Sequence, residues 1–336
     1  MQPTPALTDV AAVDKVKELE FSDLYLGHPA LANRFSDVPG AAANPLPAGP
    51  ALQEDLRLLT EACMAEQGKA PDADGFKVVY DGVSYRVSTM PAQGGNVFVV
   101  RKIASAVSTL ADLGIPQAYI RRMMMRDLAG LFVISGPLKS GKTMTAGAML
   151  KERLTAHGGV AVTGENPVEL PLEGNHGNGV CFQTALPRTP GGLADAFRSM
   201  MRWRAGTILI DEIRDQESAA ELLKASFNGH LVITTMLAGD VVQTVTRLHA
   251  LANERFGPKS TNALLADGLL GVLHQQMVRS AKHAPKLETE FLFLKDAPTT
   301  RTVLRKGEFE LLTSDIRRQM AAMISENASV HRMAPN

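Results

Sequence analysis

Cysteine, net charge and long apolar runs are all scarce in this sequence, and each shortage argues against a class of protein. The 336 residues include only two cysteines, Cys63 and Cys181, which excludes a four-cysteine zinc module and makes a disulfide framework unexpected. No apolar run approaches the roughly 20 residues that a membrane-spanning helix needs. The amino terminus does not have the basic-then-apolar order of a signal peptide. We therefore expect a cytoplasmic protein, whose attachment to a membrane would need a partner protein.

The absence of excess charge argues against a nucleic-acid motor. Lys and Arg together number 35, as do Asp and Glu, so the formal net charge is zero. Binding a phosphate backbone without sequence preference relies on a surplus of basic side chains, so we expect no stable nucleic-acid partner. Hydrophobic residues make up 45% of the chain, which is ample for buried cores, and the length suits two domains of ordinary size.

The first hundred residues are predicted to form a small α+β domain. Asp81-Gly82 is a pair that favours a type I′ hairpin turn, here between strands at 76–80 and 83–88. Because side chains alternate along a strand, Arg86 is expected on the face opposite to Tyr85 and Val87. A third strand, at 97–100, runs into Arg101. A preceding amphipathic helix is predicted from four apolar residues at helical spacing: Leu52, Leu56, Leu59 and Cys63.

From Leu131 onward, short apolar runs alternate with helical segments, a pattern typical of a parallel α/β sheet. The predicted strands are 131–135, 160–163, 207–210 and 231–235, and the predicted helices are 142–156, 192–203, 216–226 and 241–251. The last sixty residues are predicted to hold a helix at 262–278, two short strands and a terminal helix near 314–324. The resulting domains are 1–101 (with a loop at about 37–50), a mainly helical connection at 102–129, the α/β domain at 130–325 and a flexible tail at 326–336.

The segment from Gly136 to Thr143 matches G-x-x-x-x-G-K-[ST] at every fixed position. It lies between a predicted strand and a predicted helix, as this phosphate-binding motif requires. Its glycines let backbone N–H groups turn inward on phosphates, and the helix amino terminus adds positive potential. Lys142 is expected to reach the β- and γ-phosphates of ATP, and the Thr143 hydroxyl to bind Mg²⁺. The expected contact residues are Gly136, Pro137, Leu138, Lys139, Ser140, Gly141, Lys142, Thr143 and Met144.

Two adjacent carboxylates end a later buried strand, 207–210. Asp211 is expected to hold the Mg²⁺ shell through water, and Glu212 to polarise the water that attacks the γ-phosphate. Adjacent carboxylates often only solvate a strand end. Their position downstream of a phosphate loop, at the carboxyl edge where α/β proteins bind ligands, favours the catalytic interpretation, above all for Glu212.

Longer motifs resemble the motor ATPases of type II secretion and type IV pili. The run Ile208 to Asp215 (I-L-I-D-E-I-R-D) is similar to that family's Walker B motif, I-L-I-G-E-x-R-D. The run Asn228 to Val232 (N-G-H-L-V) is similar to the start of its histidine box, and Val162 to Glu169 to its aspartate box. Tyr85 to Ser88 and Val99 to Ile103 resemble its F-R-V and F-R-x-I strands. In size and layout the pilus retraction ATPases (PilT-like) are the most similar, and the ATPases of conjugation and type IV secretion (DotB/TraJ-type) are also similar.

This resemblance implies a RecA-like P-loop ATPase domain preceded by a smaller PAS-like α+β domain, assembled as a homohexamer. ATP would bind between the two domains. The resemblance assigns catalytic roles to Lys142, Glu165, Glu212 and His230, and points Arg86 and Arg101 of the amino-terminal domain toward the phosphates. Arginine suits that role, since its fixed fork neutralises charge spread over phosphate oxygens. Arg198 and Arg202 would line the subunit junction, although their i, i+4 spacing equally fits a solvated helix face.

Three positions depart from the family pattern. Asn166 replaces the aspartate of the aspartate box, and Asp211 stands where the family has glycine, which could restore one carboxylate to the Mg²⁺ shell. Leu237 occupies the place of the second histidine, so His230 is the one that remains. A lone histidine at a strand start is more often structural than catalytic. These changes permit a slow or partner-activated ATPase.

The leading functional hypothesis is a ring motor of a type IV pilus or type II secretion-like machine. ATP hydrolysis would drive domain rotation against a polytopic inner-membrane platform protein. One alternative is the ATPase of a conjugative or effector-delivering type IV secretion system. Another is a weakly active ring component that regulates a paralogous ATPase. A DNA-translocating RecA-like motor is a further alternative, which the neutral charge disfavours.

Overall fold

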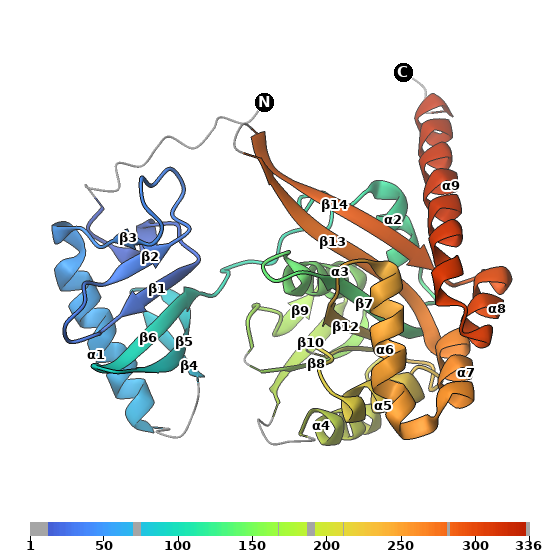
Figure 1. Ribbon diagram of the computed structural model, residues 1–336, viewed down its shortest axis with the longest axis horizontal. Coiled ribbons are helices and arrows are strands. Elements are labelled where there is room, and N and C mark those ends of the chain that lie inside the picture. Colours follow the sequence, from blue (N-terminus) through green and yellow to red (C-terminus); the bar gives the residue numbers. More distant parts are fainter. Residues whose placement is uncertain are drawn as a thin grey trace. The chain divides into compact units, whose positions relative to one another are not determined.

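The computed structural model divides by its internal contacts into two units, Met1–Ala106 and Val107–Asn336 (Figure 1). The boundary lies inside the predicted connection 102–129. The structure describes residues 13–69, 75–166, 168–186, 192–210, 212–280 and 283–333, with side chains throughout these ranges except at 279–285 and 324–333.

The first unit is an antiparallel sheet with a helix, α1 (Gln53–Lys69), packed against it. The described strands lie in the order β3-β2-β1-β6-β5-β4, and each neighbouring pair is antiparallel. The four apolar residues that predicted the helix are all buried, which confirms that prediction. The strands are β1 (Asp23–Leu26), β2 (Arg34–Ser36), β3 (Leu46–Pro47), β4 (Gly75–Tyr80), β5 (Val83–Ala92) and β6 (Gly95–Lys102).

The predicted hairpin joins β4 to β5. Asp81 and Gly82 have φ angles of 47° and 76°, and two positive φ values are the requirement of a type I′ turn. Tyr85 and Val87 are completely buried in the core, while Arg86 is only half-buried on the other face. The predicted orientation of Arg86 is therefore confirmed.

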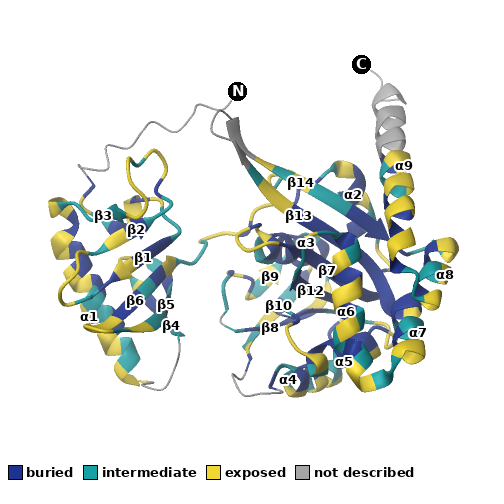
Figure 2. Cartoon of the chain, viewed as in Figure 1, coloured by how far each residue is buried: buried dark blue, intermediate teal, exposed yellow. Residues whose placement is uncertain are grey.

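The second unit is built on a mostly parallel sheet in the order β14-β13-β7-β12-β11-β8-β10-β9. Antiparallel pairing is confined to the two ends, β13 with β14 and β10 with β9. The central strands β7, β11 and β12 are almost wholly buried (Figure 2), as strands covered on both faces must be. The strands are β7 (Gly130–Gly136), β8 (Gly159–Glu165), β9 (Gly174–His176), β10 (Gly179–Ala185), β11 (Thr207–Ile210), β12 (Leu231–Leu237), β13 (Leu269–Ser280) and β14 (His283–Phe293).

The helices of the second unit cover this sheet. Helix α3 contacts β7, β8, β10, β11 and β12, and helices α4 to α7 pack on one another in sequence. The apolar faces of helices α4 to α7 form one continuous core with the sheet. The helices are α2 (Gln117–Met123), α3 (Lys142–His157), α4 (Gly192–Met200), α5 (Gln216–Ala225), α6 (Val241–Phe256), α7 (Pro258–Gly268), α8 (Pro298–Lys306) and α9 (Leu312–Met333).

Three sequence predictions need correction. The predicted helix 262–278 ends at Gly268, and β13 begins there, because a continuous apolar run suits a buried strand as well as a helix. The predicted helical connection contains helix only at Gln117–Met123 within its range. Helix α9 continues to Met333, past the predicted end of order at Ser325, since the segment consists largely of residues that helices tolerate.

In the part of the chain that the structure describes, no helix is both long and apolar enough to pass through a membrane.

Candidate nucleotide-binding site

The G-x-x-x-x-G-K-T segment forms a loop between the end of β7 and the start of α3, as its sequence context predicted. Gly141, the N-cap of α3, has a φ of 85°, which favours glycine. Gly136 leaves no room for a side chain, because a Cβ built there would lie 2.1 Å from the backbone oxygen of Gln275. Both glycines are therefore required by the shape of this phosphate loop.

Lys142 lies over the loop. Its Nζ donates hydrogen bonds to the carbonyl oxygens of Gly136 at 3.1 Å and Pro137 at 2.8 Å. The side chain is buried, and burial lowers the pKa of Lys142, while the negative charge of Glu212 opposes that shift. The amine is thus held at the loop and lies within electrostatic reach of Glu212.

Thr143 and Glu165 line one small pocket, together with Ala146, Glu169 and Thr235. Thr143 comes from the first turn of α3, and Glu165 ends β8, so the pocket joins the phosphate loop to a second strand. A hydroxyl and a carboxylate are oxygen donors of the kind that Mg²⁺ prefers. The described residues contain no group of three or more His, Cys, Asp or Glu side chains placed to hold a metal ion.

Glu165 is 4% exposed and is held by several donors. The Thr163 hydroxyl donates to its Oε1 at 2.5 Å, and Gln183 Nε2 donates to the same oxygen at 2.9 Å. Gln183 also donates to the Leu170 carbonyl and accepts two backbone N–H bonds at 2.8 and 2.9 Å. No local pattern in the sequence marks Gln183, because its contact with Glu165 depends on the pairing of β10 with β8.

Glu212 follows β11, at the same edge of the sheet as the phosphate loop. Its Oε2 accepts a hydrogen bond from Arg214 Nη2 at 3.3 Å, and its side chain is 13% exposed. The parallel pairing β8-β11-β12-β7 brings the carboxyl ends of these strands together. Glu165, Glu212 and the phosphate loop therefore converge on one edge. Asp211 lies outside the described residues.

His230 lies at the opposite edge of the sheet, which corrects its predicted place in the catalytic group. It precedes Leu231, whose partner on β7 is Gly130, the first residue of that strand. Its Nδ1 lies 2.7 Å from the Ala205 carbonyl oxygen. Leu237, which pairs with Gly136, is seven positions further along the chain, so His230 is roughly 20 Å from the loop along the strand.

Arg86 and Arg101 belong to the first unit. They are direct partners between β5 and β6, and Lys77 of β4 is the partner of Arg86 on its other side. Like charges placed opposite each other on neighbouring strands repel. The Arg101 guanidinium donates to Oδ1 of the buried Asp23 at 2.6 and 3.0 Å, which offsets part of this repulsion.

Arg198 and Arg202 lie on the exposed side of α4 and the turn that follows it. Arg198 pairs with Asp195 at 2.5 Å, with Glu217 at 3.2 Å and with Glu221 at 3.3 Å. These contacts join α4 to α5 within the chain. They fit the interpretation that Arg198 lies on a solvent-exposed helix face.

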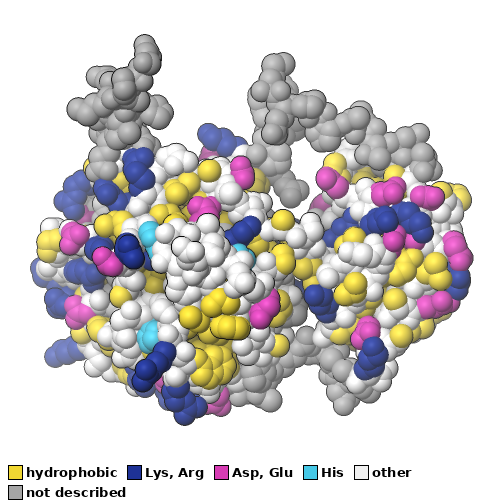
Figure 3. Space-filling view, turned by 180° about the vertical axis from the view of Figure 1, so that it is seen from behind, with side chains coloured by type: hydrophobic (Ala, Val, Ile, Leu, Met, Phe, Trp, Pro, Cys, Tyr) yellow, Lys and Arg dark blue, Asp and Glu magenta, His cyan; other side chains and the backbone are white. Residues whose placement is uncertain are grey.

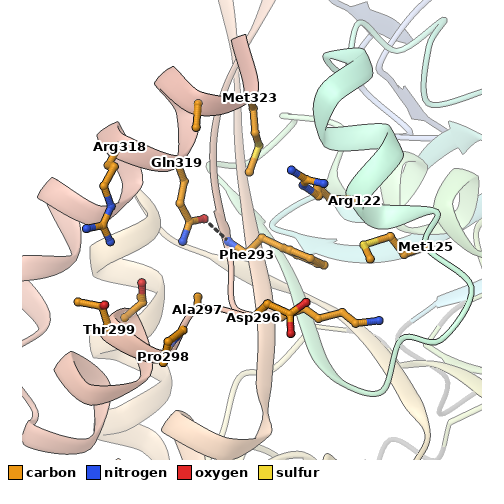
Figure 4. Close-up of a pocket in the computed structure, with 13 residues that line it drawn as sticks. Arg122, Met125, Phe293, Asp296, Ala297, Pro298, Thr299, Arg318, Gln319 and Met323 are labelled. Carbon is orange, nitrogen blue, oxygen red and sulfur yellow. Dashed lines mark hydrogen bonds between the residues drawn. The ribbon is translucent and has the colours of Figure 1, made fainter. Parts of the chain in front are cut away.

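A separate hollow of about 420 Å³ lies between α2, the end of β14, α8 and α9, and none of its lining residues belongs to the phosphate loop (Figure 4). Its Lys295 donates to the Asp127 carbonyl at 2.9 Å, and its Arg318 pairs with Asp315 at 2.5 Å. Asp296 adds a carboxylate to the wall. Because these cations already have partners in the protein, we assign the hollow no ligand.

Solved structures with the same fold include the pilus retraction motor PilT with bound ADP. Its TM-score is 0.73 at 21% identity, covering 90% of this chain and 87% of that one. The ATPase DotB of Legionella pneumophila has a TM-score of 0.66 at 20% identity, covering 89% and 83%. At such identities the likeness establishes the fold.

Curated relatives are similar over much of the chain. The type IV pilus assembly ATPase PilB of Thermus thermophilus is 33% identical over 233 residues, 68% of this chain and 24% of that protein. The protein transport protein HofB homolog of Escherichia coli is 29% identical over 293 residues, 83% of this chain and 60% of that protein. The chain thus spans less than two thirds of the length of these relatives. The family model described as "Type II/IV secretion system protein" matches residues 42–334. The chain therefore belongs to the type II/IV secretion system protein family.

Proposed function

We propose that this chain binds ATP with Mg²⁺ at the phosphate loop and hydrolyses it to ADP and phosphate. One observation supports the proposal above all others. The loop lysine, Lys142, and two carboxylates from different strands, Glu165 and Glu212, meet at the carboxyl edge of one parallel sheet, where α/β proteins bind their ligands.

Each residue has a role that its position suits. Lys142 would move from the carbonyls of Gly136 and Pro137 to the phosphate oxygens, whose negative charge outweighs two carbonyl dipoles. Glu212 would orient and polarise the attacking water. Glu165, fixed by Thr163 and Gln183, would hold the polar side of the pocket in place.

The Mg²⁺ assignment rests on oxygen donors. We propose Thr143 and, through water, Asp211 as the protein groups that hold the ion, with Glu165 on the same pocket as Thr143. When bound, Mg²⁺ would offset part of the negative charge of the phosphates.

Arg86 and Arg101 are proposed as phosphate-neutralising groups. In support, Lys77, Arg86 and Arg101 form a cross-strand row of cations on one face of the first unit. Like charges on neighbouring strands repel, and the negative charge of a bound phosphate group would lower that repulsion.

At the level of the machine, we propose a homohexameric motor of a type IV pilus or type II secretion-like system. It would act on a polytopic inner-membrane platform protein by ATP-driven domain rotation. The two-unit chain and the similarity to PilB and PilT support this reading. The similarity to DotB keeps a type IV secretion motor as the alternative. Basic and acidic side chains lie interspersed on the face shown in Figure 3, which gives no support to a DNA-translocating motor.

A regulatory ring component is a second candidate, favoured by one position. Leu237 ends β12 beside Gly136, at the phosphate-loop edge, where the family resemblance would place a histidine. A paralogous ATPase would then supply most of the turnover.

The test compares the wild-type chain with Lys142→Ala and Glu212→Gln. We expect the wild type to bind and hydrolyse ATP, Lys142→Ala to lose binding, and Glu212→Gln to bind without turnover. Equal ATP uptake by the wild type and Lys142→Ala would refute the proposed site. Tight binding with negligible hydrolysis by the isolated wild type would favour the regulatory role.

A further inference from the structure

Strand β13 lies directly beside the phosphate loop. Its His274 is the partner of Ser135, the residue that precedes Gly136 on β7. One residue further along β13, the backbone oxygen of Gln275 lies so close to Gly136 that a Cβ there would approach it to 2.1 Å. Gln275 therefore contacts the beginning of the loop through its backbone.

The Gln275 side chain contacts the other end of the loop. It is 1% exposed, and its Nε2 donates a hydrogen bond to the Ser140 carbonyl oxygen at 2.6 Å. A Cβ built on Gly141 would lie 3.3 Å from the same Nε2. Its Oε1 is buried and accepts no hydrogen bond within the described chain, so the single side-chain bond is the one to Ser140.

We propose that Gln275 is a positioning residue for nucleotide binding, which fixes the orientation of the Ser140–Gly141 peptide in the phosphate loop. In a trans peptide the C=O of one residue and the N–H of the next point in opposite directions. Holding the Ser140 carbonyl toward Gln275 therefore aims the Gly141 N–H away from β13, on the side where a phosphate would bind.

The peptide needs such a restraint because of the glycine beside it. Gly141 has a φ of 85°, and glycine occupies positive and negative φ about equally well. Without a bond to its carbonyl, the Ser140–Gly141 peptide can rotate and present oxygen instead of N–H to the phosphate. An oxygen in that position repels the anion.

Neighbouring contacts hold Gln275 in place. The His274 Nδ1 lies 3.3 Å from the Ser135 hydroxyl, which accepts a hydrogen bond from Thr244 Oγ1 of α6 at 2.7 Å. Both His274 and Thr244 are buried. These contacts tie β13, β7 and α6 together immediately behind the loop, so Gln275 acts from a fixed support.

The inference rests on the proposed nucleotide binding and makes a distinct prediction within it. If, without the Gln275 hydrogen bond, about one tenth of the molecules hold the Ser140–Gly141 peptide in the orientation that binds phosphate, the apparent affinity for ATP falls about tenfold. The complex, once formed, is unchanged. We therefore expect Gln275→Met, which keeps the size but removes the donor, to raise KM for ATP about tenfold with kcat nearly unchanged. Gln275→Glu should weaken binding further, because a carboxylate would face the Ser140 carbonyl.

Gln276 provides a matched control, since it is the next residue on β13 and is exposed. The full-length wild type, Gln275→Met, Gln275→Glu, Gln276→Met and Lys142→Ala are compared by ATP titration, steady-state kinetics and nucleotide-free melting temperature. Support requires weaker binding for both Gln275 variants, unchanged binding for Gln276→Met, and a melting temperature of Gln275→Met close to that of the wild type.

The outcomes separate the two proposals. If the wild type binds no ATP, or binds it as Lys142→Ala does, the proposed function fails. If the wild type binds ATP, Lys142→Ala does not, and Gln275→Met matches Gln276→Met, the function stands and the inference about Gln275 is wrong. A loss in kcat alone, or a fall in melting temperature with unchanged affinity, also overturns it.

Discussion

Replacing Gly136 with alanine tests whether β13 constrains the phosphate loop. The added Cβ would lie 2.1 Å from the Gln275 backbone oxygen and 2.6 Å from Ser140 Oγ. Close carbon–oxygen contacts in proteins are about 3.3 Å, so the two strands must separate by about 1 Å. Overpacking of this kind costs about 1–3 kcal/mol, a weakened ladder bond adds about 1 kcal/mol, and the positive φ adds about 1–2 kcal/mol. We expect Gly136→Ala to lower the free energy of unfolding by about 3–6 kcal/mol and to abolish ATP binding.

Gly159 supplies the control for backbone strain. It begins β8 with a φ of 91°, and a Cβ built there meets nothing within 4 Å. Gly159→Ala should therefore lower the free energy of unfolding only by the cost of the positive φ, about 1–2 kcal/mol. Urea unfolding of both variants at constant m-value gives the difference. Equal destabilisation by the two substitutions would refute the close approach of β13 to the loop.

Four further predictions concern the pocket and its surroundings. Glu212→Gln should retain ATP binding and lower turnover by at least about 100-fold, measured by phosphate release; turnover near the wild-type rate would remove Glu212 from its role. Gln183→Leu should lower the free energy of unfolding by about 2 kcal/mol, because it deprives Glu165 and two backbone N–H groups of partners; chemical denaturation that shows no change would contradict this. Asp211→Gly should raise the Mg²⁺ concentration needed for half-maximal activity. An unchanged Mg²⁺ requirement would refute the proposal that Asp211 restores a carboxylate to the Mg²⁺ shell. Burial lowers the pKa of His274 below 6.5. As pH falls through 6.5, the unfolded chain therefore binds more protons than the folded chain, and the free energy of unfolding should fall from pH 7 toward pH 5. Burial also lowers the pKa of His249, so the test is whether His274→Gln reduces the dependence of the unfolding free energy on pH.

The parts of the fold that local patterns encode were predictable. The strand that leads into the phosphate loop, the helix that follows it, and the Asp81-Gly82 hairpin all have short-range signals in the sequence. Strand β13 was mistaken for helix because Leu269 to Leu273 is an apolar run without a distinguishing period. Its strand character comes from pairing with β7, which is a non-local contact.

The same distinction applies to the site. Lys142, Thr143, Glu165 and Glu212 lie in or next to recognisable motifs, and the sheet brings their strand ends together. Gln183 and Gln275 reach their partners across 18 and 135 residues, and no local pattern marks either one. The misplacement of His230 was avoidable. It precedes its strand, whereas Glu165 ends one and Glu212 follows one, so in a parallel sheet it had to lie at the other edge.

Two of the departures from the family pattern, Asn166 and Leu237, lie at the ends of strands, and this suggests which property they change. Asn166 follows β8 directly after Glu165, and Leu237 ends β12 beside Gly136. Neither belongs to the loop whose amides and lysine would bind the phosphates. An amide in place of a carboxylate still forms hydrogen bonds but carries no charge, and leucine can transfer no proton. Substitutions of this kind leave nucleotide affinity in place and lower the rate of the step that needs charge or proton movement. Replacing Leu237 with histidine should therefore raise kcat without changing the affinity for ATP. A change confined to affinity would show that the end of β12 contributes to ATP binding instead.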